Sequence, residues 1–179
     1  MKLPNWLKKL FNIKEKTPIA TEPQKTSEVP LPTTPSVVIH PCWYLKALNE
    51  IGVREVSGNA ANPRIREYHS STDLKATSDE VAWCAAFVNW CLKECGKLGT
   101  QKANARSFLT WGTEVKENPM KGDVVVFWRG KKDGWEGHVA FYVDQDDKYI
   151  NVLGGNQGNE VNFTKYKKSQ LLGIRRLSA

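Results

Sequence analysis

Apolar residues at the start of the chain recur with a helical period. They occupy the positions i, i+3, i+4, i+7 and i+8: Leu3, Trp6, Leu7, Leu10 and Phe11. Lysines occupy the other side. The pattern predicts a short basic amphipathic helix over residues 1–16, suited to peripheral contact with an anionic membrane or to docking on a partner. The alternative is a marginal helix that frays in water, because short isolated helices are barely stable.

Residues 17–37 have no apolar period. They hold five of the nine prolines and many threonines, which predicts a polyproline-like linker. We therefore expect a single folded domain over residues 38–179, a length that suits one hydrophobic core.

The first half of this domain has helical patterns. A first helix is predicted in "HPCWYLKALNEIGVREV" (residues 40–56), ended by Gly52, with an apolar side made of Trp43, Leu45, Leu48 and Ile51. A short helical piece around residues 65–68 follows in a polar connection. Next come a longer apolar helix that contains Cys84 and stops at Gly96, and a smaller helix within residues 103–112.

The start of the helix that contains Cys84 has two solutions. The sequence "TSDE" at 77–80 matches a capping box, which would place Cys84 in the second turn. A start at Cys84 itself would instead aim the free N–H groups of the first turn at its sulfur.

The second half of the domain changes its period. The runs "VVVFWR", "HVAFYVD" and "KYINVLGG" are β-branched and aromatic and are separated by Gly and Asp, which predicts consecutive strands, with a last strand near "GIRRLS". Helices followed by an antiparallel sheet define an α+β fold.

Composition and charge narrow the class of protein. The chain is 40% hydrophobic and 25% charged, and no apolar run approaches the roughly 20 residues of a membrane span. The net charge is +7, but residues 1–37 carry six lysines against three glutamates, so the folded domain is only mildly basic. We expect no nucleic-acid partner.

The four cysteines are Cys42, Cys84, Cys91 and Cys95. They form no CxxC pair and have no histidines at zinc-finger spacing, so we expect no metal site. Cys84 and Cys91 lie too far apart along one helix for a disulfide. Cys91 and Cys95 are expected to be reduced and mostly buried.

Two residues are placed for nucleophilic chemistry. Cys84 lies near a predicted helix N-terminus, and a thiol becomes a useful nucleophile as the thiolate, beside an imidazole or a helix N-terminus. His138 follows the glycine-rich loop "RGKKDGWEG" and opens a strand, a position that suits a general base. His40 and His69 lie in polar connections and are not expected to be catalytic.

An imidazole base needs an acceptor for its other nitrogen, and an Asn or Gln side chain can supply one. If residues 146–148 form a three-residue hairpin loop, His138 faces Asn156 on the next strand. A four-residue loop would instead require a bulge at Gly154 and Gly155. Asn156 is the preferred acceptor and Gln157 the alternative.

The order of these residues resembles the CHAP and NlpC-type cysteine peptidases and amidases, which have papain-like folds and cut peptidoglycan. The resemblance spans roughly residues 42–177 and looks closest to a bacterial and phage-associated subgroup. The motifs that carry it are "NPRIREY", "DEVAWCAAFVNWC", "ARSFLTWG", "GDVVVFWRG", "GHVAFYV" and "LGGNQGNEV".

The resemblance implies a nucleophile at Cys84, a general base at His138 and an orienting residue at Asn156, with no metal or organic cofactor. It also favours a helix start at Cys84. Many CHAP sequences have an acidic residue two places before the Asn, where this chain has Gly154. Glu80 is a candidate for supplying that carboxylate instead, or it is only a helix cap.

Substrate contacts are also expected near the site. Trp83, Trp128 and Trp135 flank it and could pack on a glycan or peptide stem, or serve only as core or rim. Three basic residues of the loop before His138 could attract carboxylates of the wall peptide: Arg129, Lys131 and Lys132.

The resulting hypothesis is a monomeric peptidoglycan hydrolase, an endopeptidase or an N-acetylmuramoyl-L-alanine amidase. The alternatives are a wall- or partner-binding module without turnover and a papain-like protease acting on proteins. Lysines interrupt any Sec-type apolar region near the N-terminus. We therefore expect synthesis in the cytoplasm and action at the wall or in the periplasm, either as a phage lysis or tail enzyme or as a delivered antibacterial effector. The N-terminal segment would serve a holin, immunity or delivery partner.

Overall fold

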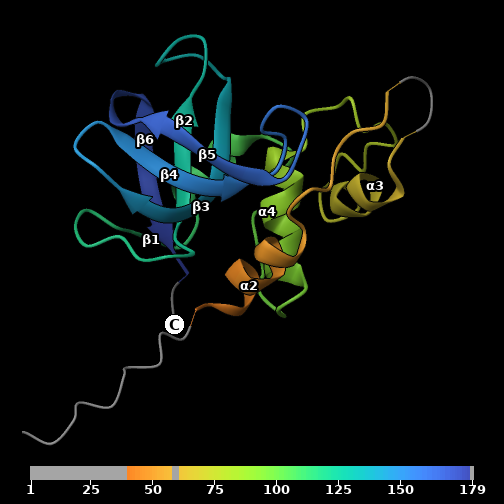
Figure 1. Cartoon of the computed structure of the whole chain (residues 1–179), viewed down its shortest axis with the longest axis horizontal. Coiled ribbons are helices and arrows are strands. Elements are labelled where there is room, and N and C mark those ends of the chain that lie inside the picture. Colours follow the sequence, from red (N-terminus) through yellow and green to blue (C-terminus); the bar gives the residue numbers. More distant parts are fainter. Residues whose placement is uncertain (1–39, 58–60, 178–179) are drawn as a thin grey trace, which may run out of the picture. The chain divides into compact units, whose positions relative to one another are not determined.

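Among the described residues, three α-helices are followed by six strands that form one antiparallel sheet (Figure 1). The structure is a computed structural model that describes residues 40–57 and 61–177. It confirms the predicted α+β class with its helices before its strands. The predicted amphipathic segment 1–16 and linker 17–37 lie outside the described residues.

The sheet has the strand order β1-β6-β2-β3-β4-β5, and all neighbouring strands are antiparallel. The strands are β1 Thr113–Glu114, β2 Val124–Trp128, β3 Gly137–Gln145, β4 Tyr149–Gly154, β5 Asn162–Lys167 and β6 Leu171–Arg176. β2, β3, β4 and β6 correspond to the predicted runs. β1 and β5 were not predicted.

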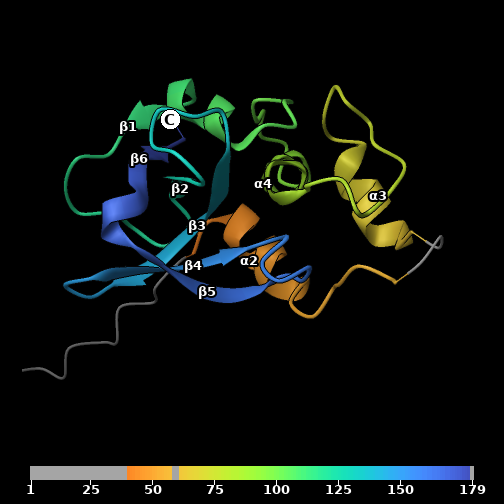
Figure 2. The same cartoon turned by 90° about the horizontal axis from the view of Figure 1, so that it is seen from above.

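Helix α4, Cys84–Lys93, lies between the sheet and helix α3, Pro63–His69 (Figures 1 and 2). Every residue of α4 except Lys93 is buried, as expected of an apolar helix covered on both sides. Helix α2, Cys42–Asn49, also packs on α4, and the 3-10 helix η1, Ala105–Thr110, packs on β2 and β3.

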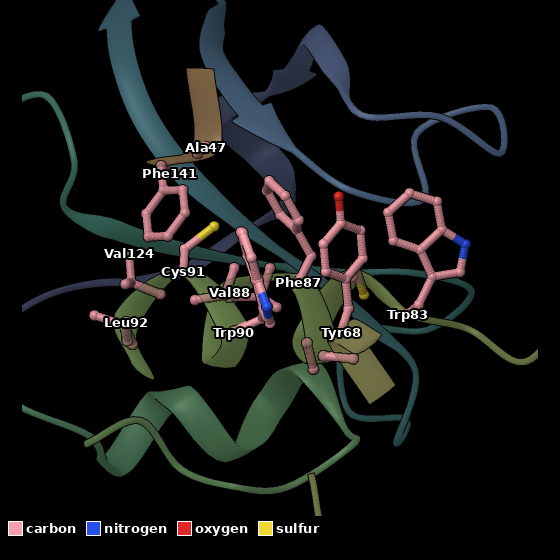
Figure 3. Close-up of a cluster of buried hydrophobic side chains, with 14 of the residues drawn as sticks. Ala47, Tyr68, Trp83, Phe87, Val88, Trp90, Cys91, Leu92, Val124 and Phe141 are labelled. Atoms are coloured by element: carbon pink, nitrogen blue, oxygen red, sulfur yellow. The ribbon is translucent and has the colours of Figure 1, made fainter. Parts of the chain in front are cut away.

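An aromatic cluster joins α3 to the start of α4. The ring of Tyr68 lies 5.8 Å from that of Trp83, 5.3 Å from Phe87 and 5.1 Å from Trp90, measured between centroids. Figure 3 shows Tyr68 between Trp83 and Phe87 within this core. Because buried aromatic rings contribute large apolar areas, this packing fixes the position at which α4 begins.

The predicted apolar side of α2 is only partly correct: Trp43 and Leu48 pack against the core. Leu45 and Ile51 are exposed, at 46% and 44%, whereas Tyr44 and Ala47 are buried. The cause is Glu50, which follows the helix and is 7% exposed. Its carboxylate accepts hydrogen bonds from Arg64 at 2.7 and 2.6 Å and from the Tyr68 hydroxyl, so this polar side faces inward.

A disulfide joins Cys42, at the start of α2, to Cys95, just after α4. The prediction of a reduced Cys95 is therefore wrong. Helical spacing constrains cysteine pairs within one helix, but it does not show that the packing of α2 on α4 brings the Cα atoms of Cys42 and Cys95 to 5.9 Å. Cys91 is a free, buried thiol as predicted, and it lies in the core shown in Figure 3.

Candidate active site

Cys84 is the first residue of α4, and Trp83 precedes the helix without a side-chain cap. The capping-box start at 77–80 is not used, because the buried Asp79 has other partners. Its carboxylate accepts hydrogen bonds from the backbone N–H groups of Val56, at 3.0 Å, and Asn62, at 2.8 Å. The segment before α4 is thus tied to the α2–α3 connection, and the first-turn N–H groups lie near the Cys84 sulfur.

His138 lies near the start of β3, where it pairs with Phe127 of β2. Side chains alternate along β3: Val139 and Phe141 belong to the core under α4, and Ala140 and Tyr142 to the core on the other face. His138 therefore belongs to the second face. Its ring is fully buried and stacks on Tyr166 of β5, with centroids 4.8 Å apart.

The thiol and the imidazole have the same neighbours at this end of β3. The backbone N–H of Val139, adjacent to His138, interacts with the Cys84 thiol, as does the charge of Arg129. Burial of Cys84, which is 5% exposed, raises the pKa of its thiol, and these two interactions only partly oppose that rise. The charge of Cys84 in turn helps to raise the pKa of Tyr166, whose ring stacks on the His138 ring.

Gln157, and not Asn156, holds the His138 ring. Gln157 Oε1 lies 3.0 Å from His138 Nε2. The Gln157 amide is fixed from behind, because its Nε2 donates to the backbone oxygen of Asn162 at 2.6 Å. Its oxygen therefore faces the imidazole and accepts the Nε2 proton, which leaves Nδ1 as the basic nitrogen.

The hairpin between β3 and β4 explains why the preferred acceptor, Asn156, is the wrong one. The loop has four residues, since Gln145 pairs with Ile150, and the register shifts at Val143. Beyond this bulge Phe141 pairs with Leu153, the register expected for a three-residue loop. β4 nevertheless ends at Gly154, and Asn156 lies in a turn with φ of 56°, so the ladder does not reach it.

Two glycines allow this turn to lie against the core. A Cβ atom at Gly154 would lie 2.7 Å from the Ala140 side chain, and one at Gly155 would lie 2.4 Å from the Trp83 ring. A side chain at either position would push the turn away from β3 or α4. At the position where many CHAP sequences have an acidic residue, this chain thus has a glycine that packs too closely for any side chain.

Arg129, at the end of β2, contacts the other nitrogen of His138. Its Nη2 lies 3.1 Å from His138 Nδ1 and donates to the Tyr166 hydroxyl at 3.2 Å. Burial and the positive charge of Arg129 lower the pKa of His138 to about 3, against the opposing effect of the Gln157 hydrogen bond. The sequence indicated Arg129 only as one basic residue of a loop, and it gave no sign of Tyr166 because β5 was not predicted.

The remaining candidates lie outside this cluster. Trp83 is fully buried and donates to Glu55 at 2.8 Å, so it is a core residue and not a substrate platform. Trp128 is half-buried, and Trp135 is 83% exposed in the loop before β3. Glu80 is exposed, and its backbone N–H donates to Ser78 at 3.2 Å, so it is neither the cap of α4 nor a contact of His138.

No group of three or more His, Cys, Asp or Glu residues in the described chain could hold a metal ion. Within residues 40–57 and 61–177, no helix is long and apolar enough to cross a membrane. The clustered groups are instead a thiol at a helix start and an imidazole oriented by an amide. A thiol and an imidazole are the groups from which a cysteine nucleophile and its base can be built.

Comparison with known proteins agrees with this description. Residues 76–156 match the CHAP domain family. The matched segment includes Cys84 and His138 and ends one residue before Gln157. This match agrees with the predicted resemblance to the CHAP family over these residues.

The sequence matches no curated protein. Among solved structures it is similar to a protein from Staphylococcus aureus subsp. aureus Mu50 described as similar to a lipoprotein of the NLP/P60 family. The identity is 17% and the TM-score is 0.46, over 77% of this chain and 41% of the other. The chain thus spans about two fifths of the length of that protein.

Proposed function

We propose that this protein is a peptidoglycan hydrolase that cleaves an amide bond of the wall peptide by a thiol mechanism. The observation that carries the proposal is the contact of His138 Nε2 with Gln157 Oε1 beside the N-terminus of α4. This contact fixes the imidazole in the tautomer whose unprotonated Nδ1 can take a proton from a thiol. In this proposal Gln157 replaces Asn156 as the orienting residue.

The reaction is an acyl transfer in two steps. Cys84 gives its proton to His138 Nδ1, and the thiolate attacks the amide carbonyl. The backbone N–H of Cys84 and a neighbouring donor stabilise the oxyanion, and His138 protonates the leaving amine. Water then attacks the thioester, His138 takes its proton, and the acid product leaves with the thiol restored.

The site of action is part of the same proposal. The Cys42–Cys95 disulfide is typical of proteins that work in oxidising surroundings, which supports action at the wall or in the periplasm and not in a reducing cytoplasm. A phage lysis or tail enzyme and a delivered antibacterial effector both fit this setting. Alkylation of free thiols in cells, followed by mass spectrometry of Cys42 and Cys95, would show in which compartment the bond forms.

Incubation with purified sacculi tests the activity. The wild-type protein should release new muropeptides, and the Cys84→Ala variant should release none. Cys91→Ala is the matched control, because Cys91 is the other free buried thiol and its charged neighbours include Glu50 and Arg64 instead of Arg129. Mass spectra of the products would identify the bond that is cut. A wild-type protein that releases nothing would support the alternative of a wall-binding module instead.

A further inference from the structure

Arg129 has no carboxylate partner among the described residues. The ion pairs found there use other arginines, such as Arg54, Arg64 and Arg176. The guanidinium of Arg129 instead contacts two neutral groups, His138 Nδ1 and the Tyr166 hydroxyl. Arg129 is exposed, whereas His138 is fully buried, so the guanidinium covers the imidazole from the solvent side.

This contact occupies the nitrogen that the proposed reaction needs. With the Nε2 proton donated to Gln157, Nδ1 is the acceptor of a hydrogen bond from Arg129. It cannot accept the Cys84 proton while that bond lasts, and the nearby positive charge makes the imidazole a weaker base. In the structure, therefore, the guanidinium of Arg129 blocks the nitrogen of His138 that would act as the base.

A carboxylate is the ligand that would change this arrangement. Guanidinium binds carboxylate through two parallel hydrogen bonds, which are stronger than its bonds to a neutral imidazole and a phenol. Such a ligand would draw Nη2 from His138 and would also neutralise the positive charge. A neutral carboxamide in the same place would do neither.

We propose that Arg129 is a specificity residue that selects substrates with a free carboxylate next to the scissile amide, and that binding of this carboxylate releases His138 Nδ1 for the thiol proton. The inference rests on the proposed hydrolase function. It adds that the free acid and the amidated form of one wall peptide are different substrates for this protein. It also gives Tyr166 a role, because its hydroxyl and ring position both Arg129 and His138.

The kinetic test uses two muropeptides that differ only in a free carboxylate or a carboxamide beside the cleaved bond. Because charge-assisted hydrogen bonds exceed neutral ones by a few kcal/mol at most, the wild-type kcat/KM should favour the acid by about 10- to 100-fold. The Arg129→Gln variant should cut the muropeptide with the free carboxylate more slowly, and its kcat/KM values for the two muropeptides should be nearly equal. The Arg129→Lys variant should keep part of the preference for the free carboxylate.

Lys116→Gln is the matched control, because it removes one exposed positive charge from a different surface loop. It should keep the wild-type preference. An unchanged preference in Arg129→Gln, with both substrates slowed equally, would mean that Arg129 is only structural and would overturn the proposal.

A titration separates this inference from the hydrolase function. In Cys84→Ala, the pKa of His138 is followed by NMR alone and with each muropeptide. The muropeptide with the free carboxylate should raise the pKa of His138, and the muropeptide with the carboxamide should not. In the double variant Cys84→Ala with Arg129→Gln, the pKa of His138 should already be raised without any ligand. An unchanged His138 pKa in Arg129→Gln would contradict the inference even if the wild type cuts sacculi. The predicted rise in a protein that cuts no muropeptide would leave the Arg129 contact established and the hydrolase function rejected.

Discussion

A single amide oxygen, Gln157 Oε1, orients the imidazole of His138, and this contact leads to a sharp prediction at the residue scale. Gln157→Ala should lower kcat by about 100-fold or more, because the ring loses the acceptor that selects its tautomer. Asn156→Gly should stay close to wild type, because glycine suits the φ of 56° and the Asn156 side chain does not hold the ring. Muropeptide release rates and circular dichroism of both variants provide the test.

A loss of activity in Asn156→Gly, with activity retained in Gln157→Ala, would show that Asn156 and not Gln157 orients the His138 ring. Asn162 offers an independent check, since its backbone oxygen and side chain hold the Gln157 amide. Asn162→Ala should lower kcat less than Gln157→Ala, because the backbone contact remains.

The sequence predicts part of this site and not the rest, for identifiable reasons. Hydrophobic periods located the helix that contains Cys84 and the strand that His138 opens. The helix start at Cys84 and the roles of both residues came from the resemblance to the CHAP and NlpC-type proteins. The choice between Asn156 and Gln157 depended on the end of β4 at Gly154 and on the turn that follows it, which no local pattern reveals. Arg129 and Tyr166 come together only through the pairing of β4 with β5, a contact of distant segments.

At the scale of elements, the Cys42–Cys95 disulfide links the first helix to the end of the central helix. It closes a loop with a sequence separation of 53 residues, for which the chain-entropy relation gives a stabilisation of about 4 kcal/mol. Replacing both cysteines by alanine should therefore lower Tm by about 10 to 20 °C. Thermal unfolding with and without a reductant provides the measurement.

The reductant should lower the Tm of the wild type and leave that of the double variant unchanged. An equal shift in both proteins would point to an effect other than loss of this bond. Because Cys84 lies at the opposite end of α4 from Cys95 and His138 belongs to β3, the reduced protein should retain activity below its new Tm.

Helices and strands were predicted correctly where local periodicity determines them, and incorrectly where contacts between distant segments determine them. Periodicity alone located α4 and the strands β2, β3 and β4, whose residues are nearly all apolar. It assigned the buried side of α2 only in part, because the Glu50–Arg64 ion pair draws a charged residue inward. It missed β5, where exposed and half-buried residues alternate and lysines occupy the outward positions, so that the strand has no continuous apolar run.

For the molecule as a whole, two fully buried histidines dominate the expected pH dependence of stability. Burial, with the charge of Arg129, lowers the pKa of His138 to about 3. Burial also lowers the pKa of His69, whose ring nitrogens form no well-aligned hydrogen bond, although the backbone of Ser78 and Val81 lies near. Each imidazole is more easily protonated in the unfolded chain than in the fold.

Stability should therefore be complete above about pH 6.5, the usual pKa of histidine, and should fall as the pH decreases toward the folded-state values. At pH 4.5 His138 alone should cost about 2 to 3 kcal/mol of the free energy of unfolding, since one pKa unit corresponds to about 1.4 kcal/mol. Carboxylates with lowered pKa values, such as Glu50 and Asp79, lose their contribution to stability mainly below this pH.

Urea unfolding between pH 4.5 and 7 therefore measures mainly the contribution of the histidines. His69→Gln with His138→Gln should make the free energy of unfolding nearly independent of pH in this range, and a slope as steep as that of the wild type would assign the effect to other groups.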